Sequence, residues 1–151
     1  MGTKNYWETT RKLLLVVNFE SLERIHEHRN AIKATGLNIN DCMVLAIVES
    51  KKECQMLTEI HSVVYASDKE INILGRWKNE NIGKVLGETF DVMMIIGDHL
   101  PKVRKQLKRV KAKILVGMNT NVEFLTIDLK SEHSAPDQLL NFAKSTLEKI
   151  N

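Results

Sequence analysis

The chain has 151 residues, of which 43% are hydrophobic and 27% are charged. This composition is close to the globular average, which excludes a disordered chain and a collagen-like repeat, and the length suits one hydrophobic core. We therefore expect a single α/β domain over 1–151, with 1–11 as an N-terminal arm. The formal net charge of +3 is too small to establish a polyanionic partner by itself.

Signals for export, membrane insertion and metal binding are missing from the sequence. The longest apolar run near the N-terminus is Leu13 to Val17, whereas a signal peptide needs about 7–15 apolar residues and a spanning helix about 20. Cys42 and Cys54 lack the CxxC spacing of a zinc site and indicate no disulfide framework. His26 and His28, two apart on one helix, face different ways. We predict a cytoplasmic protein with no membrane partner, no metal and no cofactor.

Short apolar runs alternate with helical patterns along the first half of the chain. The runs at 12–18, 43–48 and 63–66 are continuous, which is typical of strands that are buried on both faces. The helical spacing between the first two runs places four side chains inward, namely Leu22, Ile25, the stem of Arg29, and Ile32. Residues 51–61 predict a short helix with Met56 facing the core.

The middle of the chain has a weaker pattern. Within 68–78, Ile71, Ile73 and Leu74 predict either an edge strand or a docked loop that ends at Gly75. Trp77 is expected to dock over the edge of the sheet, since a tryptophan in a loop more often closes a core than marks an interface. A helix is then predicted over 79–86, with Gly87 as its terminator.

The clearest unit lies between residues 90 and 117. It reads as a strand at 90–96, a turn at 97–99, a helix over 100–110 and a second strand at 114–117. This is a βαβ unit of the usual size, and its crossover should be right-handed. Residues 122–129 alternate in part and predict a sixth strand at an edge.

The last helix begins at 134–137, where Ser134 is an N-cap candidate and Pro136 suits the first turn. Five or six strands alternating with four or five helices predict an α/β fold, a three-layer sandwich around a mostly parallel sheet. A Rossmann-like and a flavodoxin-like strand order both fit this pattern.

In open parallel sheets, ligands bind beyond the carboxyl ends of the strands. That rule selects six candidates for a ligand crevice: Asn18, Glu20, Gly97, Asp98, His99 and Asn119. An Asp98–His99 pair can do acid–base work; alternatively, Asp98 only caps the following helix and His99 is solvated. Neither GxGxxG nor GxxxxGK[ST] occurs in the sequence, which disfavours a Rossmann dinucleotide site.

One stretch of the chain is strongly basic. It holds seven cations and no acid: Lys102, Arg104, Lys105, Lys108, Arg109, Lys111 and Lys113. On a helix over 100–111, the apolar side chains fall on one side and the cations spread across the rest. Such a surface can hold RNA phosphates, or it is the solvated outer face of an amphipathic helix. No aromatic residue interleaves with these charges, so stacking of bases is unsupported.

Four segments in this order carry a resemblance: LLLVVNFESLERI, SDKEINILGRWKN, FDVMMIIGDHLP and VKAKILVGMN. Over 12–130 the chain resembles an uncharacterised family of small cytoplasmic proteins from Bacteroidetes-type bacteria, and that family implies no activity. FDVMMIIGDHLP, a basic helix and AKILVG are also similar to the N-terminal, sugar-acceptor half of heptosyltransferase-type glycosyltransferases. Those enzymes need a second Rossmann-like domain for the nucleotide sugar, so we expect at most a lone half.

These observations favour a non-enzymatic α/β binding module that acts through a surface on a protein partner or an RNA-containing assembly. The alternative is a small-molecule-binding protein or small enzyme that uses the crevice near Asp98 and His99. A homodimer formed through an edge strand or an exposed helix is a third possibility.

Overall fold

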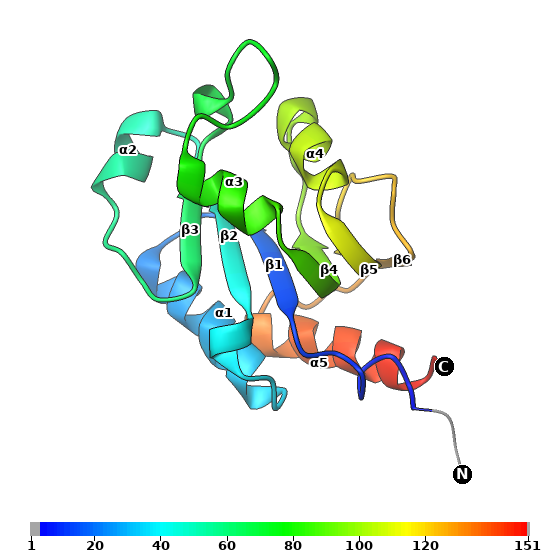
Figure 1. The fold of residues 1–151 in the computed structure, drawn as a ribbon. Coiled ribbons are helices and arrows are strands. Elements are labelled where there is room, and N and C mark those ends of the chain that lie inside the picture. Colours follow the sequence, from blue (N-terminus) through cyan, green and yellow to red (C-terminus); the bar gives the residue numbers. More distant parts are fainter. Residues whose placement is uncertain (1–3, 151) are drawn as a thin grey trace.

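A computed structural model describes residues 4–150, and within them six strands form one sheet with helices on both faces (Figure 1). The strands are β1 (Leu13–Asn18), β2 (Met43–Ile47), β3 (Val63–Ala66), β4 (Thr89–Ile96), β5 (Lys111–Met118) and β6 (Ile127–Leu129). The helices are α1 (Leu22–Ala34), α2 (Lys51–Met56), α3 (Glu80–Leu86), α4 (Pro101–Lys108) and α5 (Pro136–Glu148), with short 3-10 turns η1 (Ile39–Asp41) and η2 (Asp68–Glu70).

The strand order is β3-β2-β1-β4-β5-β6, and all five pairings are parallel. The α/β class predicted from the sequence is confirmed, and the order is the Rossmann one rather than the flavodoxin-like one. The central strand β1 has neighbours on both sides, with Leu14 opposite Met43 of β2 and Met93 of β4. All carboxyl ends therefore meet at one edge of the sheet.

The continuous apolar run of β1 is explained by burial on two faces. Leu13, Leu15 and Val17 contact one core, whereas Leu14 and Val16 contact the other. All five side chains are buried, so no polar residue alternates with them.

Each face of the sheet is covered by its own pair of helices (Figure 1). One core receives α1 and α5 through Ile25, Ala31, Ile32, Leu139, Leu140, Ala143 and Leu147. The opposite core receives α3 and α4 through Ile82, Val85, Val103 and Leu107. Trp77 also packs into this second core, and its Nε1 donates a hydrogen bond to the Ser67 carbonyl at 2.7 Å, which satisfies the buried indole N–H.

Two helices differ from their predicted form on the first half of the chain. On α1, His28 is buried beside Ile25 and Ile32, whereas Arg29 is only half-buried, because the 3-4 spacing of a helical stripe runs through residue 28. The helix predicted over 51–61 is wrong in length. It ends at Met56, which is 74% exposed, since the next residue, Leu57, turns into an extended conformation with ψ 143.

The second half of the chain also departs from its predicted boundaries. α4 ends at Lys108, because the backbone leaves the helix after the C-cap Arg109 and enters β5 at Lys111. Ser134 is not the N-cap of α5; that position is Ala135, which makes no side-chain cap bond. Residues 71–77 form a turn closed by an Ile71–Trp77 bridge and not an edge strand of the sheet.

Within the part of the chain that the structure describes, no helix combines the length and the apolar character needed to cross a membrane.

Candidate functional site

A crevice lies where the course of the sheet reverses. After β1 the chain builds outward through β2 and β3, then returns to pair β4 with the other side of β1. At such a switch point the loops on the two sides diverge and leave room for a ligand. The crevice has a volume of about 220 Å³ and is lined by Val17, Asn18, Glu20, Arg24, His28, Ile96, Gly97, Asn119, His133, Ser134 and Leu139.

The ends of β1 and β4 are tied together at the floor of this crevice. The Asn18 side-chain amide donates to the Asp98 carbonyl at 2.9 Å. Gly97 has a φ of +79°, and a Cβ there would lie 3.1 Å from the Asn18 Nδ2. Glycine is required here because it accepts the left-handed backbone and leaves the amide room to reach across.

Asn119, directly after β5, forms one wall of the crevice. Its backbone is also left-handed, with φ +53°, a conformation that asparagine tolerates better than most residues. Its Nδ2 donates to the Ser131 carbonyl at 3.0 Å, and the Ser131 N–H donates to its Oδ1 at 2.9 Å. This reciprocal pair holds the 130–135 loop in place, so that His133 and Ser134 complete the wall.

The opposite wall of the crevice is the first half of α1. Ser21 caps this helix, because its side chain accepts a hydrogen bond from the Arg24 N–H. The Arg24 guanidinium is clamped between two carboxylates, with Nε 2.8 Å from Glu20 and Nη1 3.0 Å from Glu27. These partly exposed pairs fix the direction of the arginine more than they stabilise the fold. Glu20 and Arg24, the two oppositely charged residues of the lining, cancel one another.

His28 lies deeper in the same wall and is 5% exposed. Among the described residues its ring makes no hydrogen bond, and its Nδ1 is sealed from solvent. Burial, assisted by the Arg24 charge, lowers the pKa of His28 to about 4, so the ring is neutral at pH 7. A neutral imidazole offers one donor and one acceptor, and leaving such a buried group unpaired is costly.

Four of the six predicted crevice residues line the crevice, namely Asn18, Glu20, Gly97 and Asn119, whereas Asp98 and His99 do not. The interpretation of Asp98 as the cap of the following helix and of His99 as solvated is wrong. Asp98 is exposed and does not cap α4, whose N-cap is Leu100 without a side-chain bond. His99 is not solvated: it is 5% exposed, its Nε2 lies 3.1 Å from the Ile96 carbonyl, and burial lowers its pKa.

Sequence reasoning missed Arg24, His28, His133 and Ser134. A signal for His28 was present, because a histidine stands at the position that the Ile25 to Ile32 stripe assigns to the core. No local pattern pointed to His133 or Ser134, since their place depends on the Asn119–Ser131 contacts.

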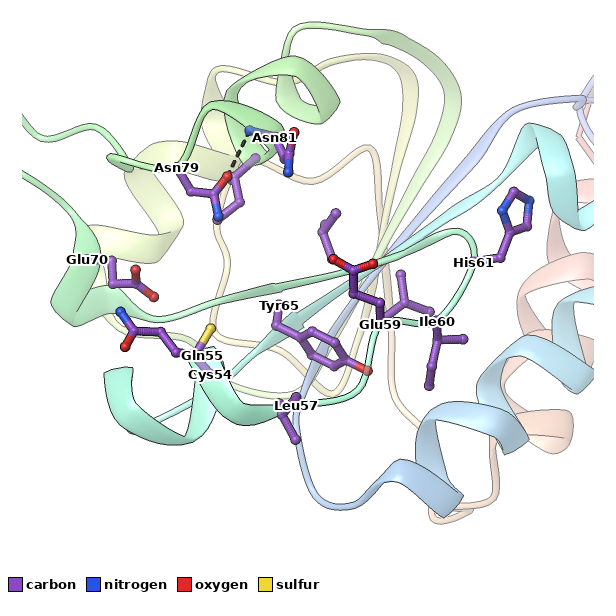
Figure 2. Close-up of a pocket in the computed structure, with 13 residues that line it drawn as sticks. Cys54, Gln55, Leu57, Glu59, Ile60, His61, Tyr65, Glu70, Asn79 and Asn81 are labelled. Carbon is purple, nitrogen blue, oxygen red and sulfur yellow. Dashed lines mark hydrogen bonds between the residues drawn. The ribbon is translucent and has the colours of Figure 1, made fainter.

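A larger cavity of about 520 Å³ lies along the free edge of β3, between α2 and α3 (Figure 2). Figure 2 shows Cys54, Glu70 and Tyr65 among its lining residues. Burial, and then the Glu70 charge, raise the pKa of Cys54 to about 12, so the thiol stays protonated and is a poor nucleophile. Burial also raises the pKa of Tyr65, whose hydroxyl donates to the Thr58 carbonyl at 3.0 Å. This cavity is therefore a weaker candidate for a functional site than the crevice at the ends of β1 and β4.

The predicted basic face is divided between two elements. Lys102, Lys105, Lys108 and Arg109 are exposed along α4, and half-buried Arg104 donates to the Asn121 carbonyl at 3.3 Å. Lys111 and Lys113 lie instead on β5, where Lys113 pairs with Asp91 at 3.3 Å. The α4 cations thus remain together as one surface.

The sheet order and the crevice define a doubly wound α/β protein of Rossmann topology with a small polar site at its switch point. The model of the Family of unknown function (DUF6913) matches residues 2–146. The chain belongs to this family. No curated protein matches the chain.

The chain is similar to two solved structures. The glycosyl transferase family 9 protein from Veillonella parvula matches with a TM-score of 0.54 and 12% identity, over 96% of this chain and 42% of its own. The E. coli heptosyltransferase WaaC with ADP-2-deoxy-2-fluoro heptose matches with a TM-score of 0.47 and 13% identity, over 92% of this chain and 49% of its own. The chain thus spans less than half the length of either structure. The Veillonella match shows a common fold.

Proposed function

We propose that the chain is a cytoplasmic binding module for a small, neutral, hydroxylated molecule held in the switch-point crevice. The observation that carries this proposal is His28, a buried neutral imidazole in the wall of that crevice, whose ring makes no hydrogen bond to any residue that the structure describes. Buried polar groups are nearly always paired in native proteins, so an unpaired one beside a cavity indicates a missing ligand or water.

The chemistry of the lining supports this class of ligand. Amide, imidazole and hydroxyl groups on Asn18, His28 and Ser134 give and accept hydrogen bonds, whereas Glu20 and Arg24 cancel in charge. The volume of about 220 Å³ is below the roughly 300–1,000 Å³ of sites for drug-sized ligands. A molecule of monosaccharide or polyol size is therefore favoured over a nucleotide, and the shared fold with a glycosyl transferase is a reason to include sugars in the test.

The experiment is a thermal-shift screen of the full chain against neutral monosaccharides and polyols, with native mass spectrometry of the best candidate. We expect one group of these compounds to raise the melting temperature. His28→Leu should abolish this response while the protein stays folded, because leucine keeps the apolar contacts of α1 and removes both hydrogen-bonding nitrogens.

His26→Leu is the matched control, since His26 is exposed on the same helix and lies outside the crevice. This variant should respond as the parent does. An equal shift in the parent and in His28→Leu would contradict the proposal, as would no shift with any compound of the panel.

A further inference from the structure

The turn between η2 and α3 projects from the α3/α4 side of the molecule (Figure 1). At its tip Ile73 and Leu74 are 102% and 78% exposed, and neither belongs to a core. The tip has a defined shape, because the Asn72 N–H donates to the Arg76 carbonyl at 2.7 Å and the Asn72 Oδ1 accepts from the Leu74 N–H at 3.0 Å. Two adjacent aliphatic side chains are therefore exposed to solvent on a turn whose shape is fixed by hydrogen bonds.

The turn is attached to the basic helix. Buried Gln106 and exposed Arg109 of α4 both donate to the Gly75 carbonyl, Arg109 at 3.3 Å. These bonds join the apolar tip to the outer side of α4, and we call the two together the turn–helix surface. It consists of Ile73, Leu74, Arg76, Lys105, Lys108 and Arg109.

The charge of this surface is strongly positive. Its four cations are exposed, and none forms an ion pair with another of the residues that the structure describes. One carboxylate, that of Glu123, lines a shallow depression together with Lys105 and Lys108. At the base of the turn the exposed cations Lys69 and Lys78 are accompanied by the acidic residues Asp68, Glu70 and Glu80, so the positive charge of the surface comes from Arg76 and the α4 side chains.

We propose that the turn–helix surface docks on an anionic lipid bilayer. Ile73 and Leu74 enter the interface, while the cations of α4 face the lipid headgroups, a combination in which apolar burial and electrostatic attraction act together. The expectation of no membrane partner rested on hydropathy, which detects spanning segments, and a two-residue apolar tip is too short to be detected in that way.

Other occupants fit this surface less well. RNA would use the cations but has no use for aliphatic side chains, because single-stranded bases stack on aromatic rings. A second copy of the chain would bring two cationic surfaces together, which costs electrostatic energy. Both remain distinguishable outcomes of the test below.

The test is flotation of the full chain with vesicles of phosphatidylcholine, alone or mixed with phosphatidylglycerol. We expect binding to the mixed vesicles only, and a loss of binding as salt is raised. Ile73→Ser with Leu74→Ser should weaken partitioning about tenfold or more, because the apolar contribution disappears. Lys105→Gln with Lys108→Gln should weaken it about tenfold through the lost headgroup attraction.

Matched controls lie on α2, away from this surface. Met56→Ser removes another exposed aliphatic side chain, and Lys51→Gln with Lys52→Gln removes two exposed cations, so both variants should bind as the parent does. The serine substitutions lie outside both cores, and circular dichroism should show an unchanged fold.

Three results would overturn the proposal. The first is equal binding with and without phosphatidylglycerol, or none to either vesicle. The second is a gel shift of polyuridine that depends on Lys105 and Lys108 while vesicle binding is indifferent to Ile73 and Leu74, which would assign the surface to RNA. The third is a dimer in light scattering that dissociates in the serine variant, which would assign it to self-association.

Discussion

His28 is a polar ring in a helix that otherwise buries aliphatic side chains, and this gives the protein a specific pH dependence. The pKa of His28 is about 4 in the folded chain and about 6.5 when unfolded. As the pH falls below 6.5 the unfolded state takes up the proton first, so the stability that is present at neutral pH is lost progressively down to about pH 4. We expect a loss of up to about 3 kcal/mol from this group.

Replacing His28 by leucine should remove that part of the acid sensitivity and raise stability at pH 7 by about 1–3 kcal/mol, because an unsatisfied buried polar group disappears. Urea unfolding between pH 4 and 7 measures both effects. A residual slope is expected from His99, whose pKa burial also lowers. Identical slopes in the parent and in His28→Leu would refute this assignment.

Gly117 in β5 is a second position at which one residue decides local packing. A Cβ there would lie 2.7 Å from the Thr120 Cγ2 and would also press on the Leu125 side chain. Gly117→Ala should therefore destabilise the protein by about 1–3 kcal/mol and loosen the loop that follows Asn119. Gly83→Ala is the opposite case, because nothing lies within 4 Å of its Cβ and alanine favours α3. In thermal unfolding, the melting temperature of Gly117→Ala should be lower than that of the parent, and the melting temperature of Gly83→Ala should be higher.

At the level of the elements, Asp91 of β4 connects three segments. Its Oδ2 accepts the N–H groups of Arg11 at 2.8 Å and Lys12 at 2.9 Å, and its Oδ1 pairs with Lys113 of β5 at 3.3 Å. Burial by itself would raise the pKa of Asp91, but the two N–H donors and Lys113 together lower it. Asp91 therefore has a structural role, because its carboxylate joins residues 11–12 and β5 to β4.

Asp91→Asn should cost about 1–3 kcal/mol at pH 7, since hydrogen bonds to a charged acceptor are lost. The cost should shrink in acid, because the folded pKa lies below the unfolded one and the contribution is lost as the pH falls through it. Asp128→Asn is the control: this exposed carboxylate lies 3.7 Å from the Lys130 ammonium and should contribute little. Urea unfolding at pH 7 and pH 3 compares the variants, and equal costs at both pH values would speak against the ionic role.

The elements of the fold could be predicted where burial leaves a local signature. β1 and β4 were found because burial on two faces removes polar residues from a strand. The strand order could not be found, because pairing depends on where each crossover returns. The position of the crevice followed from the strand ends, and the helical stripe of α1 carried a signal for the burial of His28. The burial of His99 could not be predicted, because its backbone exchanges hydrogen bonds with the side chain of the distant Asn121, and no short segment encodes that contact.

For the molecule as a whole, the two cores share the same strands, so they should unfold together. Trp7 packs against the α1/α5 core, with the Lys144 ammonium 5.8 Å from its ring centre, and Trp77 is buried in the α3/α4 core. The variants Trp7→Phe and Trp77→Phe each leave one fluorescent reporter. For each variant, the urea midpoint measured by tryptophan fluorescence should coincide with the midpoint measured by circular dichroism. Separate midpoints for fluorescence and circular dichroism would mean that the layers unfold independently.

The central position of β1 in the sheet has a consequence for folding during translation. The strand is translated before its partners, yet it pairs with β2 on one side and with β4, residues 89–96, on the other. A nascent chain therefore carries this apolar strand with one edge unpaired until residues 89–96 have been synthesised. Unpaired apolar edges of this kind invite aggregation, so the interval before β4 appears is when a chaperone would matter most.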